Sequence, residues 1–206
     1  MANMVLACFF AGRGVYPWNK IDARSRFYAE NDFNFLDAEG EWMLSADGWL
    51  YYIPCKGETV ENTVCHIPVA KQFVSINGKD MGLQVDGVKF SHIDFMYAAY
   101  LTPDEGNAQM QAAAGIGTVV EADFARNIHF TDCTIAHTGL GGIWFKRGCS
   151  DCSLERCHLY DLGASGVKLG ETAIRENHDE ITHHIRIDNN IIPHGGYVFP
   201  CAVGVT

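Results

Sequence analysis

A short pattern repeats along this chain at a fixed spacing. Residues 126–148 (RNIHFTDCTIAHTGLGGIWFKRG) align with residues 150–171 (SDCSLERCHLYDLGASGVKLGE) at an offset of 24 positions, and residue classes match on both sides of a glycine-rich turn. Further copies occupy residues 88–97 and 185–196, each displaced by one period plus an insertion. A period in the twenties, made of short alternating apolar segments separated by Gly, Asn and Asp, predicts a solenoid.

The pattern inside each unit indicates which solenoid to expect. Residues 128–130 alternate, the alternation breaks at Thr131-Asp132, and it resumes at residues 133–135 and 143–145, so each unit contains strands of three or four residues. The leucine spacing of a leucine-rich repeat and the 3- and 4-residue spacing of a helical repeat are both missing from the sequence. The sequence therefore predicts an all-β fold, a right-handed parallel β-helix of three-stranded coils stacked about 4.8 Å apart.

The shared register predicts the core. Side chains that occupy the same inward position in successive units should stack in buried columns. The residues expected in these columns are Ile128, Phe130, Ile135, Ile143, Phe145, Leu154, Leu159, Val167, Leu169, Ile185 and Ile187.

The N-terminal part of the chain does not share the repeat. Residues 1–80 are predicted to form a β lobe and lead-in strands, and residues 81–206 are predicted to form the coils. Within the lobe, two alternating aromatic-rich runs, 41–45 and 49–54, flank Asp47-Gly48, which is a strong hairpin signal.

Insertions and chain ends complete the organisation. Residues 101–117 and 172–184 interrupt the coils, and insertions in a solenoid project from one face, frequently the binding face. Residues 204–206 match residues 166–168, so the chain is expected to be the N-terminal piece of a longer protein, because a solenoid normally ends in a polar cap. Residues 1–14 are apolar without a preceding basic residue, which favours a strand or a fragment start over a signal peptide.

The composition argues against two classes of binding partner, nucleic acids and membranes. The net charge is −10, with 25 acidic and 15 basic residues, which argues against nucleic acid because phosphate contacts need clustered Lys and Arg. No run of eighteen apolar residues is present, so a membrane partner is not expected.

The spacing of Cys149, Cys152, Cys157 and His158 resembles a zinc pattern. The repeat register instead places Cys152 and Cys157 at inward positions, where they behave as small hydrophobes. Cys133 and Cys157 on adjacent coils lie within disulfide reach, although reduced, stacked thiols are the expected state. No metal and no organic cofactor are expected.

Several longer motifs resemble a known family. They are GEWMLSADGWLYYIP (40–54), YLTPDEG (100–106), VEADFARNIHF (120–130), AHTG (136–139), GIWFKRG (142–148) and DLGASGVKLGE (161–171). Together they are similar to the parallel β-helix glycoside hydrolases related to the α-L-fucosidase/xylanase and β-xylosidase β-helix families. The resemblance implies a secreted or periplasmic bacterial enzyme that degrades polysaccharides, and a fold that continues for further coils. It assigns neither the sugar nor the catalytic acids.

One candidate site is an outward face of the coils. If Val120 and Ala122 point inward, Glu121 and Asp123 point outward and share a sheet face with further polar and aromatic residues on neighbouring coils, namely Trp144, Lys146 and Lys168. Aromatic rings stack on sugars, and two carboxylates about 5 to 5.5 Å apart can act as acid and nucleophile. The alternative is that Glu121 and Asp123 only form ion pairs with the two lysines on a solvated face.

A second candidate is a column of polar residues at one turn position. Tyr97, His137, Asp161 and His194 share this position, and a His beside a carboxylate can orient a sugar hydroxyl. The alternative is a structural hydrogen-bonded ladder. Glu171 ends a coil directly before an insertion, where binding residues tend to collect.

The insertion 172–184 contains a second potential metal pattern. Its members are His178, Asp179, His183 and His184. A solvated loop is the favoured interpretation.

These observations predict a hydrolase that acts on a plant or algal polysaccharide or oligosaccharide through paired carboxylates, drawn from Glu121, Asp123, Asp161 and Glu171. Trp144, Lys168, His137, His194 and Tyr97 are the expected substrate-binding residues. One alternative is a polysaccharide lyase with Lys168 as the proton acceptor and Ca²⁺ held by acids. Another is a non-catalytic carbohydrate-binding β-helix.

Overall fold

The computed structural model describes residues 31–103 and 110–206, and the apolar start expected as a strand lies outside these ranges. The described chain is nearly all β, as predicted, and its contacts divide it into two compact units between His66 and Ile67. In the described ranges, no helix is long and apolar enough to cross a membrane.

The smaller unit contains the predicted hairpin. Strands β1 (Trp42–Leu44) and β2 (Leu50–Tyr52) are antiparallel, with Met43 opposite Tyr51. Gly48 in the connecting turn has a φ of +88°, a left-handed conformation that glycine adopts without a steric penalty. A short 3₁₀ helix, η1 (Phe33–Phe35), places Phe33 edge-on against Tyr51, so this face of the hairpin is partly covered. The hairpin prediction is confirmed.

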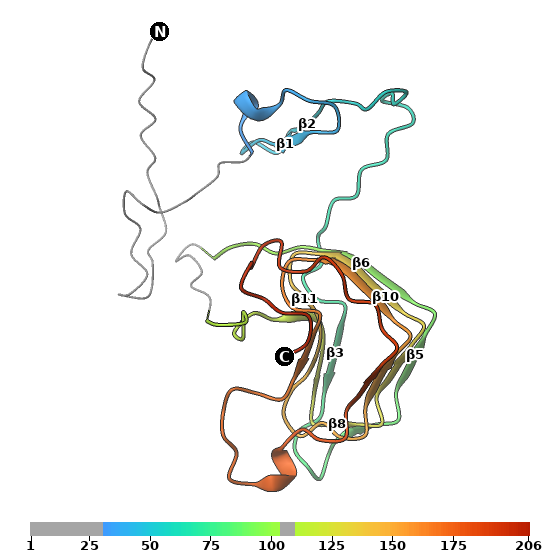
Figure 1. The fold of residues 1–206 in the computed structure, drawn as a ribbon, viewed down its shortest axis with the longest axis vertical. Helices are drawn as coiled ribbons and strands as arrows, with labels where there is room; N and C mark the ends of the chain where they lie inside the picture. The colour runs from blue at the N-terminus through green and yellow to red at the C-terminus, as the bar shows by residue number, and fades with distance from the viewer. Residues whose placement is uncertain (1–30, 104–109) are drawn as a thin grey trace, which may run out of the picture. The chain divides into compact units, whose positions relative to one another are not determined.

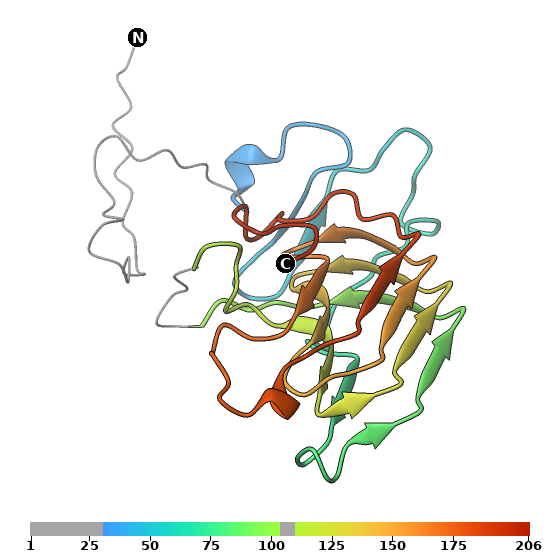
Figure 2. The same cartoon turned by 60° about the horizontal axis from the view of Figure 1, so that its bottom comes forward.

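The larger unit consists of short strands that the chain visits in a repeating order (Figures 1 and 2). Three larger parallel sheets have the orders β14-β11-β7-β3, β15-β12-β9-β5 and β13-β10-β6, and β4 pairs with β8. The elements are β3 (Val74–Asn77), β4 (Val85–Asp86), β5 (Lys89–Ser91), β6 (Asp94–Ala98), β7 (Thr118–Asp123), β8 (Ala125–Arg126), β9 (His129–Thr131), β10 (Thr134–Thr138), β11 (Gly141–Phe145), β12 (Ser153–Glu155), β13 (His158–Leu162), β14 (Val167–Leu169), η2 (His178–Glu180) and β15 (Arg186–Asp188).

The strands pair in the register that the sequence predicts. Leu154 lies opposite Phe130 on one side and Ile187 on the other, and Phe90 lies opposite Phe130. Val205 forms a parallel bridge to Val167, which agrees with the predicted match between residues 204–206 and residues 166–168. Strand β3, expected among the lead-in strands before residue 81, pairs with β7 and belongs to the same parallel sheet as β7, β11 and β14.

The core follows the predicted inward columns, with three corrections. Ile128, Phe130, Ile135, Ile143, Phe145, Leu154, Leu159 and Val167 are fully buried. Leu169 is 37% exposed, and Ile185 and Ile187 are only half-buried. Strand β15 lies at the edge of its sheet, and beyond β14 only the last residues of the chain pair with it, through Gly204 to Thr206, so these side chains have less cover than those of the inner strands.

Residues with positive φ recur in three stacks, two in the connections between strands and one that begins inside β6, β10 and β13, where it interrupts the strand pairing. The chain must turn sharply there, and Asn, Asp and His tolerate the left-handed conformation better than most residues. The three stacks are His92, Asp132, Arg156 and Asn189; Tyr97, His137, Asp161 and His194; and Asn127, Asp151 and His184.

The repeated glycines mark places where neighbouring coils approach backbone to backbone. A Cβ added at Gly163 would lie 2.2 Å from the carbonyl oxygen of Gly139, and one at Gly142 would lie 2.5 Å from that of Gly166. Real Cβ atoms do not approach a carbonyl so closely. The neighbouring backbones can therefore approach so closely only because positions 142 and 163 carry no side chain.

We expect Gly163→Ala to lower the free energy of unfolding by about 1 to 3 kcal/mol, because overpacking forces the neighbouring backbone to move. Gly204→Ala is the matched control, since a Cβ there meets nothing within 4 Å. Urea unfolding of both variants measures the difference. Equal midpoints for the two variants would contradict the close approach.

Candidate functional site

Three residues of the first candidate face, Glu121, Trp144 and Lys168, lie side by side, and Ser75 extends the row. In the register of β3, β7, β11 and β14, Glu121 pairs with Ser75 and Trp144, and Trp144 pairs with Lys168. Their neighbours Val120, Ile143 and Val167 are buried in the core. Because successive side chains of a strand point to opposite faces, this column lies on the outer face, as predicted.

The Glu121 carboxylate is held from two sides. The Thr118 backbone N–H donates to Oε1 at 3.1 Å, and the Lys146 ammonium lies 3.4 Å from Oε2. Both side chains of the ion pair are largely covered, with 19% of Glu121 and 27% of Lys146 exposed. The ion pairing that the sequence left as an alternative is therefore present, although Lys146 is the partner of Glu121 rather than of Asp123.

Asp123 pairs with Arg147, a residue that sequence analysis did not select. Asp123 Oδ1 lies 3.8 Å from Arg147 Nε, too far for a direct hydrogen bond, and both atoms are buried without a hydrogen-bond partner. The Arg147 guanidinium lies over the Phe124 ring, 4.3 Å from its centroid. Charge attraction and ring contact therefore fix Arg147 beside the end of β7.

Lys168 is on the outer face, but residues of the first insertion cover it. Only 4% of Lys168 is exposed, and its ammonium donates to the carbonyls of Ala114 and Ile116, both at 2.7 Å. It also lies 3.4 Å from the centroid of the Trp144 ring. This corrects the expectation of an open surface: Lys168 does not face a substrate, and its ammonium occupies one face of the expected Trp144 platform.

Burial changes the acidity of Lys168. Loss of solvent lowers the pKa of its ammonium to about 8. The Glu121 carboxylate opposes this decrease and the Lys146 ammonium adds to it.

The second candidate column also forms in the structure. Tyr97, His137, Asp161 and His194 all have φ between 50° and 66° at the same corner. His137 Nδ1 lies 2.6 Å from Asp161 Oδ2, and the His137 ring stacks on Tyr97 with centroids 5.1 Å apart. This geometry fits both the structural ladder and a sugar-binding ridge, so the substrate-binding role of these residues stays a prediction.

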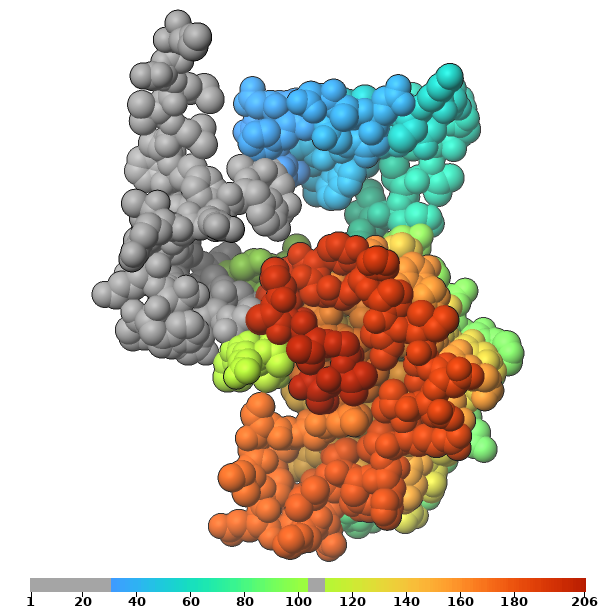
Figure 3. Space-filling view, viewed as in Figure 1, coloured from blue at the N-terminus to red at the C-terminus, as the bar shows by residue number. Residues whose placement is uncertain are grey.

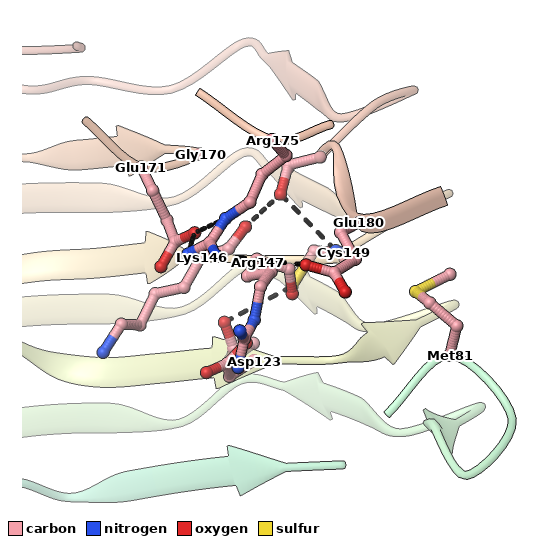
Figure 4. A network of polar contacts seen from close by, with 12 residues as sticks. Met81, Asp123, Lys146, Arg147, Cys149, Gly170, Glu171, Arg175 and Glu180 are labelled. Carbon is pink, nitrogen blue, oxygen red and sulfur yellow. Dashed lines mark hydrogen bonds and ion pairs between the residues drawn. The ribbon is translucent and has the colours of Figure 1, made fainter. Parts of the chain in front are cut away.

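Glu171 lines a cavity of about 270 Å³. Its carboxylate accepts hydrogen bonds from Arg175 Nε, at 2.8 Å, and from Arg175 Nη2. Arg175 Nη1 lies 4.0 Å from the Glu180 carboxylate, so one guanidinium contacts two carboxylates (Figure 4). The complete lining is Arg147, Gly170, Glu171, Ala173, Ile174, Arg175, Glu180, Ile181 and Thr182.

The second insertion builds this cavity and is tied to the coils by its returning end. The Gly148 N–H donates to the Glu180 carbonyl at 2.8 Å, and the Thr182 hydroxyl donates to the Lys146 carbonyl. In Figure 3 this insertion (orange) and the C-terminal residues (red) cover the visible end of the coils. Sequence reasoning selected Glu171 but missed Arg147, Arg175 and Glu180. The i,i+4 spacing of Glu171 and Arg175 was the available signal.

The smaller unit has a separate groove. It measures about 780 Å³ and is lined by Asn31, Phe35, Gly40, Glu41, Trp42, Leu44 and Ser45. Trp42 is 64% exposed, so an aromatic surface is available on this hairpin by itself.

The cysteines behave as the register predicts. Cys133, Cys149, Cys152 and Cys157 are buried free thiols, and burial raises the pKa of Cys149 to about 12 and that of Cys152 to about 11. The Cys133 N–H donates to Cys157 Sγ at 3.5 Å. Among the residues that the structure describes, no three His, Cys, Asp or Glu side chains are grouped to hold a metal ion.

Comparison with known proteins supports the fold. No known protein family and no curated protein matches the chain. A solved structure named "Glycoside hydrolase" is similar, with a TM-score of 0.73 and 19% sequence identity over 82% of this chain. The match covers 35% of that protein, so this chain spans about a third of its length. The fold is therefore like that of a glycoside hydrolase, and an identity this low carries over no residue roles.

The lowered pKa of Lys168 predicts a pH dependence of stability. Between about pH 8 and pH 10 the unfolded chain keeps a proton that folded Lys168 has lost, and stability rises with pH where the unfolded state binds more protons. The free energy of unfolding of the wild type should therefore increase relative to that of Lys168→Met across this range. Urea unfolding from pH 7 to 10 tests it, with exposed Lys89→Met as the control. If the free energies of unfolding of the wild type and Lys168→Met differ by the same amount at every pH, the lowered pKa of Lys168 is contradicted.

Proposed function

We propose that this chain is part of a glycoside hydrolase that acts on a plant or algal polysaccharide, built on a right-handed parallel β-helix. The observation that carries the proposal is the cavity beside the coils, in which one guanidinium contacts two carboxylates, those of Glu171 and Glu180. The solved structure with a similar fold supports the reaction class.

The proposed β-helix rests on the sheet orders. The chain visits the three larger parallel sheets in turn, and corresponding strands of successive circuits pair side by side. Such circuits stack their inward side chains into columns, as the buried core does. This architecture leaves the outer faces and the insertions to form a binding surface.

The chemistry follows from the carboxylates at the cavity. Glycoside hydrolysis uses two carboxyl groups, one as the proton donor and the other as the nucleophile or as the base that activates water. Glu171 and Glu180 are the proposed pair; Arg175 donates hydrogen bonds to Glu171 and lies 4.0 Å from the Glu180 carboxylate. Asp123, which pairs with cavity-lining Arg147, and Glu121 on the same sheet are the proposed ligands of sugar hydroxyls.

A hydrolase is favoured over a lyase that uses Lys168 as its base. A lyase needs a proton acceptor in contact with the sugar. The Lys168 ammonium is buried and donates to two backbone carbonyls, so it has no access to a bound polysaccharide. The groove of the hairpin unit leaves a non-catalytic carbohydrate-binding role as the second alternative.

We expect Glu171→Gln to lower kcat by about 10²- to 10⁴-fold, the usual contribution of one acid or base group. Exposed Glu176→Gln, from the same insertion and outside the cavity lining, should keep wild-type turnover. Reducing-end release from plant and algal polysaccharides measures turnover, and ultraviolet absorbance of unsaturated uronides detects a lyase.

Three outcomes would count against the proposal. Wild-type turnover in Glu171→Gln would show that Glu171 has no catalytic role. A rise in ultraviolet absorbance would indicate a lyase, and binding of the polysaccharide without products would indicate a carbohydrate-binding protein.

A further inference from the structure

The end of the first insertion, residues 110–117, is docked on the coils; we call it the docking segment. Ala113 and Ile116 are buried in a small second core with Ala164 and Phe199. Ala112 forms a parallel bridge to Ala202. This segment is therefore an ordered part of the outer face, although it does not belong to the repeat.

Lys168 binds the docking segment through hydrogen bonds to its backbone. Its ammonium has three N–H donors, and two of them are used by the carbonyls of Ala114 and Ile116. The third side of the ammonium lies against the Trp144 ring, which in turn donates its indole N–H to the Gly170 carbonyl at 2.7 Å. Residues 110–117 contain no ionisable side chain, so Lys168 binds the backbone of the docking segment.

The docking segment leads directly to Glu121. It ends at Gly117, where a Cβ would lie 3.2 Å from Glu121 Oε1, and the next residue, Thr118, donates its backbone N–H to the same oxygen. The carbonyl of Gly117 accepts from the Gly141 N–H at 3.1 Å, which ties this point to β11. The position of the Thr118 amide, and with it the orientation of Glu121, depends on where the docking segment lies.

We propose that Lys168 is a positioning residue that fixes the docking segment and thereby orients the Glu121 carboxylate toward a sugar. This inference rests on the proposed function for the sugar, but the mechanical link between Lys168 and Thr118 does not. It differs from the sequence prediction, in which Lys168 contacts the substrate itself.

Hydrogen exchange on the 206-residue chain tests the mechanical link without any substrate. In Lys168→Met, which keeps the aliphatic stem but loses the ammonium, we expect the amides of Ala113, Ala114, Ile116 and Thr118 to exchange about tenfold faster, since two charge-assisted hydrogen bonds are lost. Core amides such as that of Leu154 should be unchanged, which shows that the variant is folded. Lys168→Arg keeps a cation and its donors and should remain close to the wild type. Exposed Lys89→Met is the matched control.

A double-mutant cycle tests whether the effect reaches the sugar through Glu121. We expect Lys168→Met to lower kcat/KM about tenfold in the wild-type background and to have almost no effect in the Glu121→Gln background, because residues that act through one another are not additive.

The outcomes separate the two proposals. Unchanged exchange in Lys168→Met would overturn the mechanical link. Faster exchange with additive losses of kcat/KM would overturn the action through Glu121, because the loss would then reach the sugar by another route. If the wild type releases no sugar, the proposed function fails, and faster exchange at Thr118 would still support the link from Lys168 to the amide that holds Glu121.

Discussion

The side-by-side pairing of short parallel strands constrains everything else in this protein. Parallel strands two to six residues long pair in a fixed register, and residues with positive φ recur at matching positions of neighbouring strands and turns. The backbones approach so closely at Gly139 and Gly163 that a Cβ is excluded. Because the strand pairing admits no extra residue, additional residues have to project from the sheets as insertions. The two insertions in this chain contribute to the candidate site.

The charged groups of the candidate site are individually restrained. Glu121 is paired with Lys146, Asp123 with Arg147, Glu171 with Arg175, and Asp161 with His137. A chain with a net charge of −10 therefore presents Glu121, Asp123 and Glu171 next to cations, while Asp161 lies within hydrogen-bond distance of the His137 ring. Partly covered ion pairs fix orientation more than they add stability, since desolvation offsets much of the attraction. Fixed orientation is what a carboxylate needs in order to bind a sugar hydroxyl, and what a protonated carboxyl group needs in order to transfer its proton to a sugar oxygen.

The burial of Lys168 shows that an insertion can cover side chains that the repeat register places on the outer face. The register places the side chain outward next to Trp144, and a neighbouring segment then covers both. The lowered pKa of the ammonium, the occupied indole face and the orientation of Glu121 all follow from this single contact.

The sequence alone determined the repeat register, the hairpin, the buried columns of the inner coils and the polar stack from Tyr97 to His194, because a periodic strand pattern fixes which side chains point inward and which coil neighbours which. It did not determine the exposure of Leu169, the cover over Lys168 or the cavity with Arg147, Arg175 and Glu180. Insertions have no period, and their paths are set by packing against residues distant in the sequence. Only the tertiary structure could therefore decide which outward residues remain accessible and which carboxylates share a cavity.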